Sequence, residues 1–132
     1  MDIYAKNILD HYQRPRNFGP LEDADIHQQE SNRSCGDEIT IHLKLEGGRI
    51  NFLSFEGRGC AISMAAMSIL SEELVGREAE QVMNMGLEEV ESFLGIEISP
   101  RRQRCASLGL RAIQGALASL RLRTEKKAET HS

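Results

Sequence analysis

The residues of this chain best suited to chemistry are three cysteines and one carboxylate, Cys35, Asp37, Cys60 and Cys105. Cys60 and Cys105 stand at predicted loop-to-helix junctions, where backbone N–H groups and the helix dipole favour the thiolate and lower its pKa. In an extended segment, the side chains of Cys35 and Asp37 would leave the backbone on the same side and could bind one metal together. Three sulfurs and one carboxylate oxygen form a set of four ligands that zinc or iron accepts.

These residues also have plainer interpretations, and composition alone does not decide between them. A cysteine is most often a small buried apolar residue, and three in 132 residues is ordinary usage. Asp37 could instead cap the turn that leads into the next strand. The odd number of cysteines argues against a disulfide framework. Together with an N-terminus unlike a signal peptide, it indicates a reducing, cytoplasmic setting.

Size and charge argue against several classes of function. The chain is long enough for one domain with a single core. Its net charge of −4 and its few aromatic residues (four Phe, two Tyr and no Trp) give no reason to expect nucleic acid. The longest strongly apolar run, residues 60–70, is too short to cross a bilayer, so no membrane partner is expected.

The order of the predicted elements indicates an α+β domain, with a small antiparallel sheet of about three strands packed against helices on one face. Alternating apolar residues predict a strand over residues 39–45, and Gly47 and Gly48 turn it into a partner strand whose alternation breaks at Phe52 and Leu53. The other predicted elements are an N-terminal helix from Asp2, a strand over 24–30, a buried helix over 61–75, short helices over 78–85 and 87–94, and a long C-terminal helix that begins at Ser99 and Pro100. We expect one domain over residues 1–123 and a polar tail over 124–132.

Four segments of the chain stand out together: residues 10–17 (DHYQRPRN), 32–37 (NRSCGD), 57–64 (GRGCAISM) and 104–108 (RCASL). In this order they resemble the motifs of the U-type iron–sulfur cluster scaffolds, the family of IscU, SufU and the N-terminal domain of NifU. The resemblance covers residues 4–120, nearly the whole chain. The four motifs are highly specific as a set, and what they imply about function is an analogy with that family.

The resemblance implies that the chain binds iron and sulfur from a cysteine desulfurase, builds a [2Fe–2S] cluster and transfers it to acceptor apo-proteins. The ligands of iron, zinc or the cluster would be Cys35, Asp37, Cys60 and Cys105. Such a scaffold is a binding protein and not an enzyme, and a monomer or weak dimer is expected. The alternative is a zinc-dependent, SufU-like sulfur acceptor, a persulfide sulfurtransferase that takes sulfur on Cys35 or Cys105. A purely structural zinc domain is a third interpretation.

Departures from the family pattern bear on these alternatives. Arg104 replaces a histidine of the IscU branch, and residues 98–102 (ISPRR) replace its chaperone-recognition stretch, which puts chaperone-driven transfer in doubt. Residues 32–35 (NRSC) replace the usual Asn-Pro-x-Cys. Ala61 and Arg104 favour the sulfur acceptor, whereas the segment 76–100 is too short for the insertion of SufU proteins and favours the scaffold. The chain is therefore expected to be a hybrid or divergent member, with the scaffold function ranked first.

Other polar candidates have mainly structural interpretations. His11, His27 and His42 could each supply a fourth ligand, but a solvated histidine is expected at each position. The methionines expected to fill the core are Met64, Met67, Met83 and Met85. Gly109 and Gly115 weaken the last helix, which indicates close packing at both.

The arginines near the cysteines are either ordinary surface charge or groups that offset the negative charge of the site. The four are Arg58, Arg101, Arg102 and Arg104. A guanidinium beside a thiolate lowers its pKa. Arg104 in particular would hold a thiolate or persulfide anion by a charge-assisted hydrogen bond, and it cannot replace histidine as a metal ligand because it has no lone pair to offer.

Overall fold

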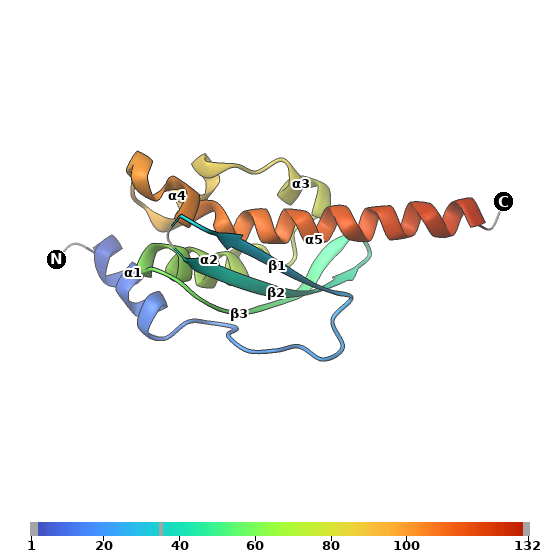
Figure 1. Ribbon diagram of the computed structural model, residues 1–132, viewed down its shortest axis with the longest axis horizontal. Coiled ribbons are helices and arrows are strands. Elements are labelled where there is room, and N and C mark those ends of the chain that lie inside the picture. Colours follow the sequence, from blue (N-terminus) through green and yellow to red (C-terminus); the bar gives the residue numbers. More distant parts are fainter. Residues whose placement is uncertain (1–2, 35, 131–132) are drawn as a thin grey trace.

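The computed structural model describes residues 3–34 and 36–130, with only the backbone described for residues 124–130. Its elements are α1 (Ile3–Gln13), β1 (Ile26–Asn32), β2 (Asp37–Glu46), β3 (Arg49–Arg58), α2 (Ala61–Glu73), α3 (Ala79–Met83), α4 (Leu87–Leu94), the 3₁₀ turn η1 (Pro100–Arg102) and α5 (Gln103–Thr130). The strands form one antiparallel sheet in the order β1-β2-β3. Helices α2 and α5 pack on one face of this sheet (Figure 1), so the predicted α+β class is confirmed.

Gly47 and Gly48 form the turn between β2 and β3, as predicted. Both have positive φ, +60° and +77°, and such a two-residue turn matches the right-handed twist of the hairpin. The register of the hairpin then shifts, since Asn51 is an extra residue in β3. Because of this bulge, Ile50 and Leu53 are both buried although strict alternation would separate them. The break in the sequence pattern is therefore a bulge.

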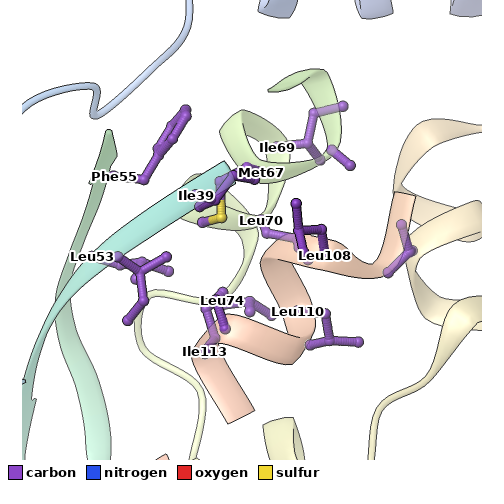
Figure 2. Close-up of a cluster of buried hydrophobic side chains, with 14 of the residues drawn as sticks. Ile39, Leu53, Phe55, Met67, Ile69, Leu70, Leu74, Leu108, Leu110 and Ile113 are labelled. Carbon is purple, nitrogen blue, oxygen red and sulfur yellow. The ribbon is translucent and has the colours of Figure 1, made fainter. Parts of the chain in front are cut away.

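The core lies between the sheet and the two helices α2 and α5 (Figure 2). The buried side chains that meet there are Ile39, Leu53, Phe55, Met67, Leu70, Leu74, Leu108 and Ile113. Met64 is also buried, and Met83 and Met85 pack against the same cluster. The methionines thus fill the core, as predicted, and a thioether suits that role because it is flexible and apolar.

Helices α2 and α5 approach each other closely at Gly109. A Cβ at this position would lie 2.6 Å from Sδ of Met67 and 3.4 Å from its Cα. Gly115, further along α5, faces β1, where a Cβ would lie 3.2 Å from Nε2 of Gln28. The close packing expected at these two glycines is confirmed. The contact at Gly109 lets α5 cross close to α2.

The segment 10–17 attaches α1 and the following loop to α2. Nδ1 of His11 lies 2.7 Å from Oγ of Ser68, which also accepts the backbone N–H of Arg16 at 2.8 Å. Asn17 donates from Nδ2 to Oγ of Ser71 at 3.1 Å. His11 is only 5% exposed, so the expectation of a solvated ring is wrong here. The chain folds back on α2 after α1, and Ser68 supplies the hydrogen bond that a buried ring requires.

Element boundaries differ from the predicted ones by a few residues. The first strand is Ile26–Asn32 and not residues 24–30. The C-terminal helix begins as the 3₁₀ turn η1, with Pro100 at its first position. The backbone of α5 stays helical to Thr130 and extends beyond the rest of the molecule (Figure 1), while the domain boundary at residue 123 stays a prediction. None of the helices within residues 3–34 and 36–130 combines the length and apolar character needed to cross a bilayer.

Candidate metal centre

Asp37, Cys60 and Cys105 meet where β2, α2 and α5 begin. Asp37 is the first residue of β2, Cys60 is the N-cap of α2, and Cys105 lies in the first turn of α5. One potential ligand atom from each residue lies within 4.8 Å of the other two. Cys35, the fourth predicted ligand, lies outside the described residues.

The spacing of these atoms fits one metal ion. Two sulfurs bound at about 2.3 Å to the same tetrahedral zinc are about 3.8 Å apart. Small side-chain rotations would therefore bring two thiolates and one carboxylate oxygen, now within 4.8 Å of one another, onto a single ion. The chemistry of the set also fits, because soft thiolates suit zinc and iron–sulfur clusters, and a carboxylate oxygen is an accepted ligand of zinc.

The carboxylate of Asp37 is held at the N-terminus of α2. Its Oδ1 accepts the backbone N–H of Cys60 at 3.0 Å, and its Oδ2 lies 3.9 Å from Sγ of Cys60. Gly36 has φ +73°, so the chain turns just before Asp37, and the predicted extended segment is not found there. Asp37 does cap, at the start of α2, where it accepts the N–H of the N-cap residue Cys60. One oxygen serves that role, and the other faces the thiol.

Two glycines before Cys60 make this close approach possible. Gly57 has φ +146°, and a Cβ there would lie 2.9 Å from Cα of Ile39 on β2. A Cβ at Gly59 would lie 2.8 Å from Oδ1 of Asp37 and would also meet Oγ of Ser63. A larger residue at either position would force the start of α2 away from β2. The Gly-x-Gly-Cys segment is thus what brings the thiol and the carboxylate together.

The environment of Cys60 favours its thiolate. Burial acts to raise the pKa of this thiol, but the backbone N–H and hydroxyl of Ser63 and the backbone N–H of Ile62 act to lower it. Asp37, as a nearby negative charge, acts to raise the pKa. The pKa is lowered on balance, as expected for a cysteine at a helix N-terminus.

Asn32 is a site residue to which the sequence assigned no role. Its Nδ2 lies 3.8 Å from Sγ of Cys105, and its Oδ1 accepts the backbone N–H of Ser34 at 3.2 Å. Cys105 itself is 4% exposed. Asn32 therefore connects the chain that precedes Cys35 to the thiol of Cys105. The signal available in the sequence was the position of Asn32 in the motif, two residues before Ser34. Its contact with Cys105 spans 73 residues of sequence and leaves no local signal.

A cavity of about 270 Å³ opens beside the two thiols and is lined by Cys60, Arg101, Arg102 and Cys105. The two arginines belong to η1, which carries them to the rim just before α5 begins. Arg104 is exposed and does not line this cavity, so of the described arginines Arg101 and Arg102 are better placed to offset negative charge there. The role predicted for Arg104 stays a prediction.

The three histidines considered as further ligands lie elsewhere in the part of the chain that the structure describes. His11 contacts Ser68 on α2. His42 contacts His27 and Glu56 within the sheet. His27 is exposed as expected, but His42 is only 6% exposed, so its predicted solvation is wrong. The reason is that neighbours on both adjacent strands satisfy the ring nitrogens of His42 and allow its burial.

The fold and the site together define the class of protein. The chain matches the family model of the NifU-like N-terminal domain over residues 3–127. It therefore belongs to this family, and the resemblance indicated by the four motifs is confirmed.

Individual relatives carry the names of both functional branches. The zinc-dependent sulfurtransferase SufU of Bacillus subtilis is 32% identical over an alignment of 133 residues, gaps included, and the alignment covers 88% of this chain and 90% of that protein. The iron–sulfur cluster assembly scaffold protein IscU of Thermotoga maritima is 39% identical over 91 residues, which cover 69% of this chain and 63% of that protein. A crystal structure from Fervidobacterium islandicum, described as an iron–sulfur cluster assembly scaffold candidate of the SUF system, superposes with a TM-score of 0.75 at 26% identity and covers 85% of this chain and 94% of that one.

Proposed function

We propose that this protein is an iron–sulfur cluster assembly scaffold. It binds iron and the sulfur that a cysteine desulfurase supplies, holds a [2Fe–2S] cluster as its cargo, and transfers that cluster to acceptor apo-proteins in the cytoplasm. The observation that carries the proposal is the meeting of Asp37, Cys60 and Cys105 within 4.8 Å at the starts of three elements. The scaffold named IscU among its relatives supports it.

The residues have distinct parts in this function. Cys60, with its lowered pKa, offers a thiolate for iron. Cys105 offers the second sulfur, and Asn32 beside it helps to fix its position. The cavity next to both thiols gives iron and sulfur a way in and the cargo a way out. Persulfide sulfur becomes sulfide only by reduction, so ferrous iron and an added thiol reductant supply the electrons.

Anaerobic reconstitution tests the proposal. The protein is mixed with ferrous iron, cysteine, a cysteine desulfurase and dithiothreitol, and visible absorption is followed by iron and sulfide analysis. We expect cluster absorption from the wild type and its loss in Cys60→Ser. Glu38→Gln is the matched control, because this carboxylate is adjacent to Asp37 but pairs with Arg58 at the surface. A cluster that forms equally well in Cys60→Ser would overturn the scaffold assignment.

A second candidate function is zinc-dependent sulfur transfer, and two observations favour it. The SufU relative aligns with 88% of this chain and 90% of its own length. Arg101 and Arg102 line the cavity beside the two thiols, where they would attract an anionic persulfide. In this reaction a protein thiolate attacks the terminal sulfur of the donor persulfide. The S–S bond of the donor breaks, a new S–S bond forms, and the donor leaves as a thiolate.

Comparing arginine variants separates the two candidates. Arg104→Ala, Arg104→His and the double variant Arg101→Ala/Arg102→Ala are tested for desulfurase stimulation, persulfide trapping and zinc affinity. If the protein transfers sulfur, at least one of these variants should lose sulfur acceptance and keep its zinc affinity. Loss in the double variant alone would assign the role to the arginines at the cavity and remove it from Arg104. Zinc affinity that collapses while sulfur acceptance persists would contradict the electrostatic role of arginine.

A further inference from the structure

A second group of metal-ligating side chains crosses the sheet away from the thiols. His27 on β1 and His42 on β2 are directly opposite each other in the antiparallel register. Their Nδ1 atoms are 2.6 Å apart, and their rings meet edge to face with centroids 4.8 Å apart. On the other side of His42, Nε2 lies 2.8 Å from Oε1 of Glu56 on β3.

This group is separate from the candidate metal centre. Residues at odd positions of β2, such as Asp37 and Ile39, face α2 and α5, whereas His42 stands at an even position. Successive side chains of a strand point to opposite faces, so His42 and its partners lie on the face that α2 and α5 leave uncovered. None of the three residues has a role in the proposed function.

We propose that His27 and His42 form a binding site for a divalent transition-metal ion, with Glu56 fixing the ring of His42. Imidazole nitrogen is a good ligand for zinc, copper and nickel. A histidine that binds a metal through one nitrogen commonly donates the N–H of the other to a carboxylate, which sets its tautomer and orientation. Glu56 stands in that relation to His42. Water completes the coordination, because His27 is exposed.

The proton arrangement of the pair already prepares His42 for a metal. A carboxylate that is ionised can only accept, so in this contact Nε2 of His42 carries the proton, and in the neutral ring Nδ1 keeps its lone pair. The short Nδ1–Nδ1 contact then requires His27 to donate its own Nδ1 proton. A metal takes the place of this proton between the two nitrogens, and His27 becomes protonated at Nε2 instead.

Little movement is needed to admit the ion. Two nitrogens bound to one tetrahedral ion at about 2.05 Å are about 3.3 Å apart, compared with 2.6 Å between the two Nδ1 atoms here. The required opening is under about 1 Å. His42 is buried and held by Glu56, so the exposed ring of His27 on the edge strand β1 is the part that moves.

Nickel titration of the full-length protein, first loaded with zinc, tests this site. Ni²⁺ is chosen because it binds imidazole and does not oxidise thiols as Cu²⁺ does. Uptake is measured by calorimetry, and the ring nitrogens are followed by ¹⁵N NMR. We expect one Ni²⁺ in the wild type with both imidazoles perturbed, and its loss in His27→Ala, which removes an exposed side chain. Glu56→Gln should weaken binding by about tenfold or more, since it removes the oriented carboxylate.

Gln29→Ala is the matched control, because Gln29 lies on the same strand and the same face as His27 and contacts Glu38. It should bind Ni²⁺ as the wild type does. Unchanged Ni²⁺ uptake in His27→Ala would overturn the proposal, as would a wild type that takes up Ni²⁺ only while releasing its zinc. A wild type that takes up no Ni²⁺ at all would overturn it as well. These outcomes leave the scaffold proposal untouched, since they concern only the histidine pair.

Discussion

The two oxygens of the Asp37 carboxylate have different partners. Oδ1 accepts the N–H of Cys60, and Oδ2 faces the thiol of that residue. An oxygen ligand is harder than a thiolate and is replaced more easily on iron in a sulfide-rich cluster. In the proposed scaffold function, Asp37 would therefore be the ligand at which cargo leaves the site.

Removing this carboxylate should slow release. In Asp37→Ala we expect an assembled cluster to live several-fold longer and to transfer to an acceptor apo-protein more slowly than in the wild type. Loss of the cap on α2 should also cost about 1 kcal/mol of unfolding free energy. Cluster decay and transfer are followed by visible absorption, with Glu38→Ala as control. Faster decay in Asp37→Ala would contradict a role in release.

The position of a site residue could be predicted from the sequence when its signal was local, and could not when it depended on contacts between distant segments. Cys60 could be placed at a helix start because the glycine turn and the apolar run of α2 adjoin it. The neighbours of Cys105 could not be predicted from the sequence, because its contact with Asn32 depends on β1 and α5 packing together. The same limit hid the burial of His42, whose partners come from two other strands.

At the scale of elements, the close crossing of α2 and α5 depends on glycine at position 109, which has no side chain to separate the two helices. Gly109→Ala would place a methyl group 2.6 Å from Sδ of Met67, and overpacking of this kind costs about 1–3 kcal/mol. Gly115→Ala, in the same helix, meets only the end of Gln28, which can move. The gain in helix propensity, up to about 1 kcal/mol, should make this change neutral or stabilising. Chemical denaturation of both variants checks the contrast, and equal effects would contradict it.

The attachment of α1 to α2 should make stability sensitive to acid. Burial lowers the pKa of His11 and Arg16 lowers it further, although Glu72 and Asp10 oppose them. The unfolded chain, with a histidine pKa of about 6.5, then binds more protons than the native state. The free energy of unfolding should therefore fall as pH drops through about 6.5 and level off below the native pKa. Denaturation between pH 8 and 5 should show a shallower slope in His11→Gln, and an unchanged slope would assign the acid sensitivity to other groups.

Elements with a strong local pattern were predicted closely, and those that depend on tertiary contacts were not. The β2–β3 hairpin followed from alternation and two adjacent glycines. The helix α4 followed from its apolar spacing. The limits of β1 were missed by two residues, because its polar strand pattern is stabilised by pairing with β2 and packing against α5.

At the scale of the whole molecule, the candidate metal centre joins three segments that are distant in sequence. An ion bound there by Asp37, Cys60 and Cys105 stabilises the native state by mass action, by about 2.7 kcal/mol at free zinc 100-fold above Kd. For a chain of this size that is a rise in Tm of roughly 10 °C. Calorimetry with and without zinc measures the rise. It should largely vanish in Cys105→Ser, and an equal rise in that variant would show that zinc binds elsewhere.

The order β1-β2-β3 leaves the sheet with two edges, and they differ. The outer edge of β3 is bridged by the loop after α1, where Phe18 pairs with Phe55. In the described chain no strand pairs with the outer edge of β1, so its backbone groups could template the addition of a strand from another molecule. The strand is short and reads His-Gln-Gln-Glu from His27 to Glu30, without the β-branched, Phe, Tyr or Trp residues that favour strand pairing. The same weak strand signal that made β1 hard to find in the sequence also makes it a poor template for the addition of another strand.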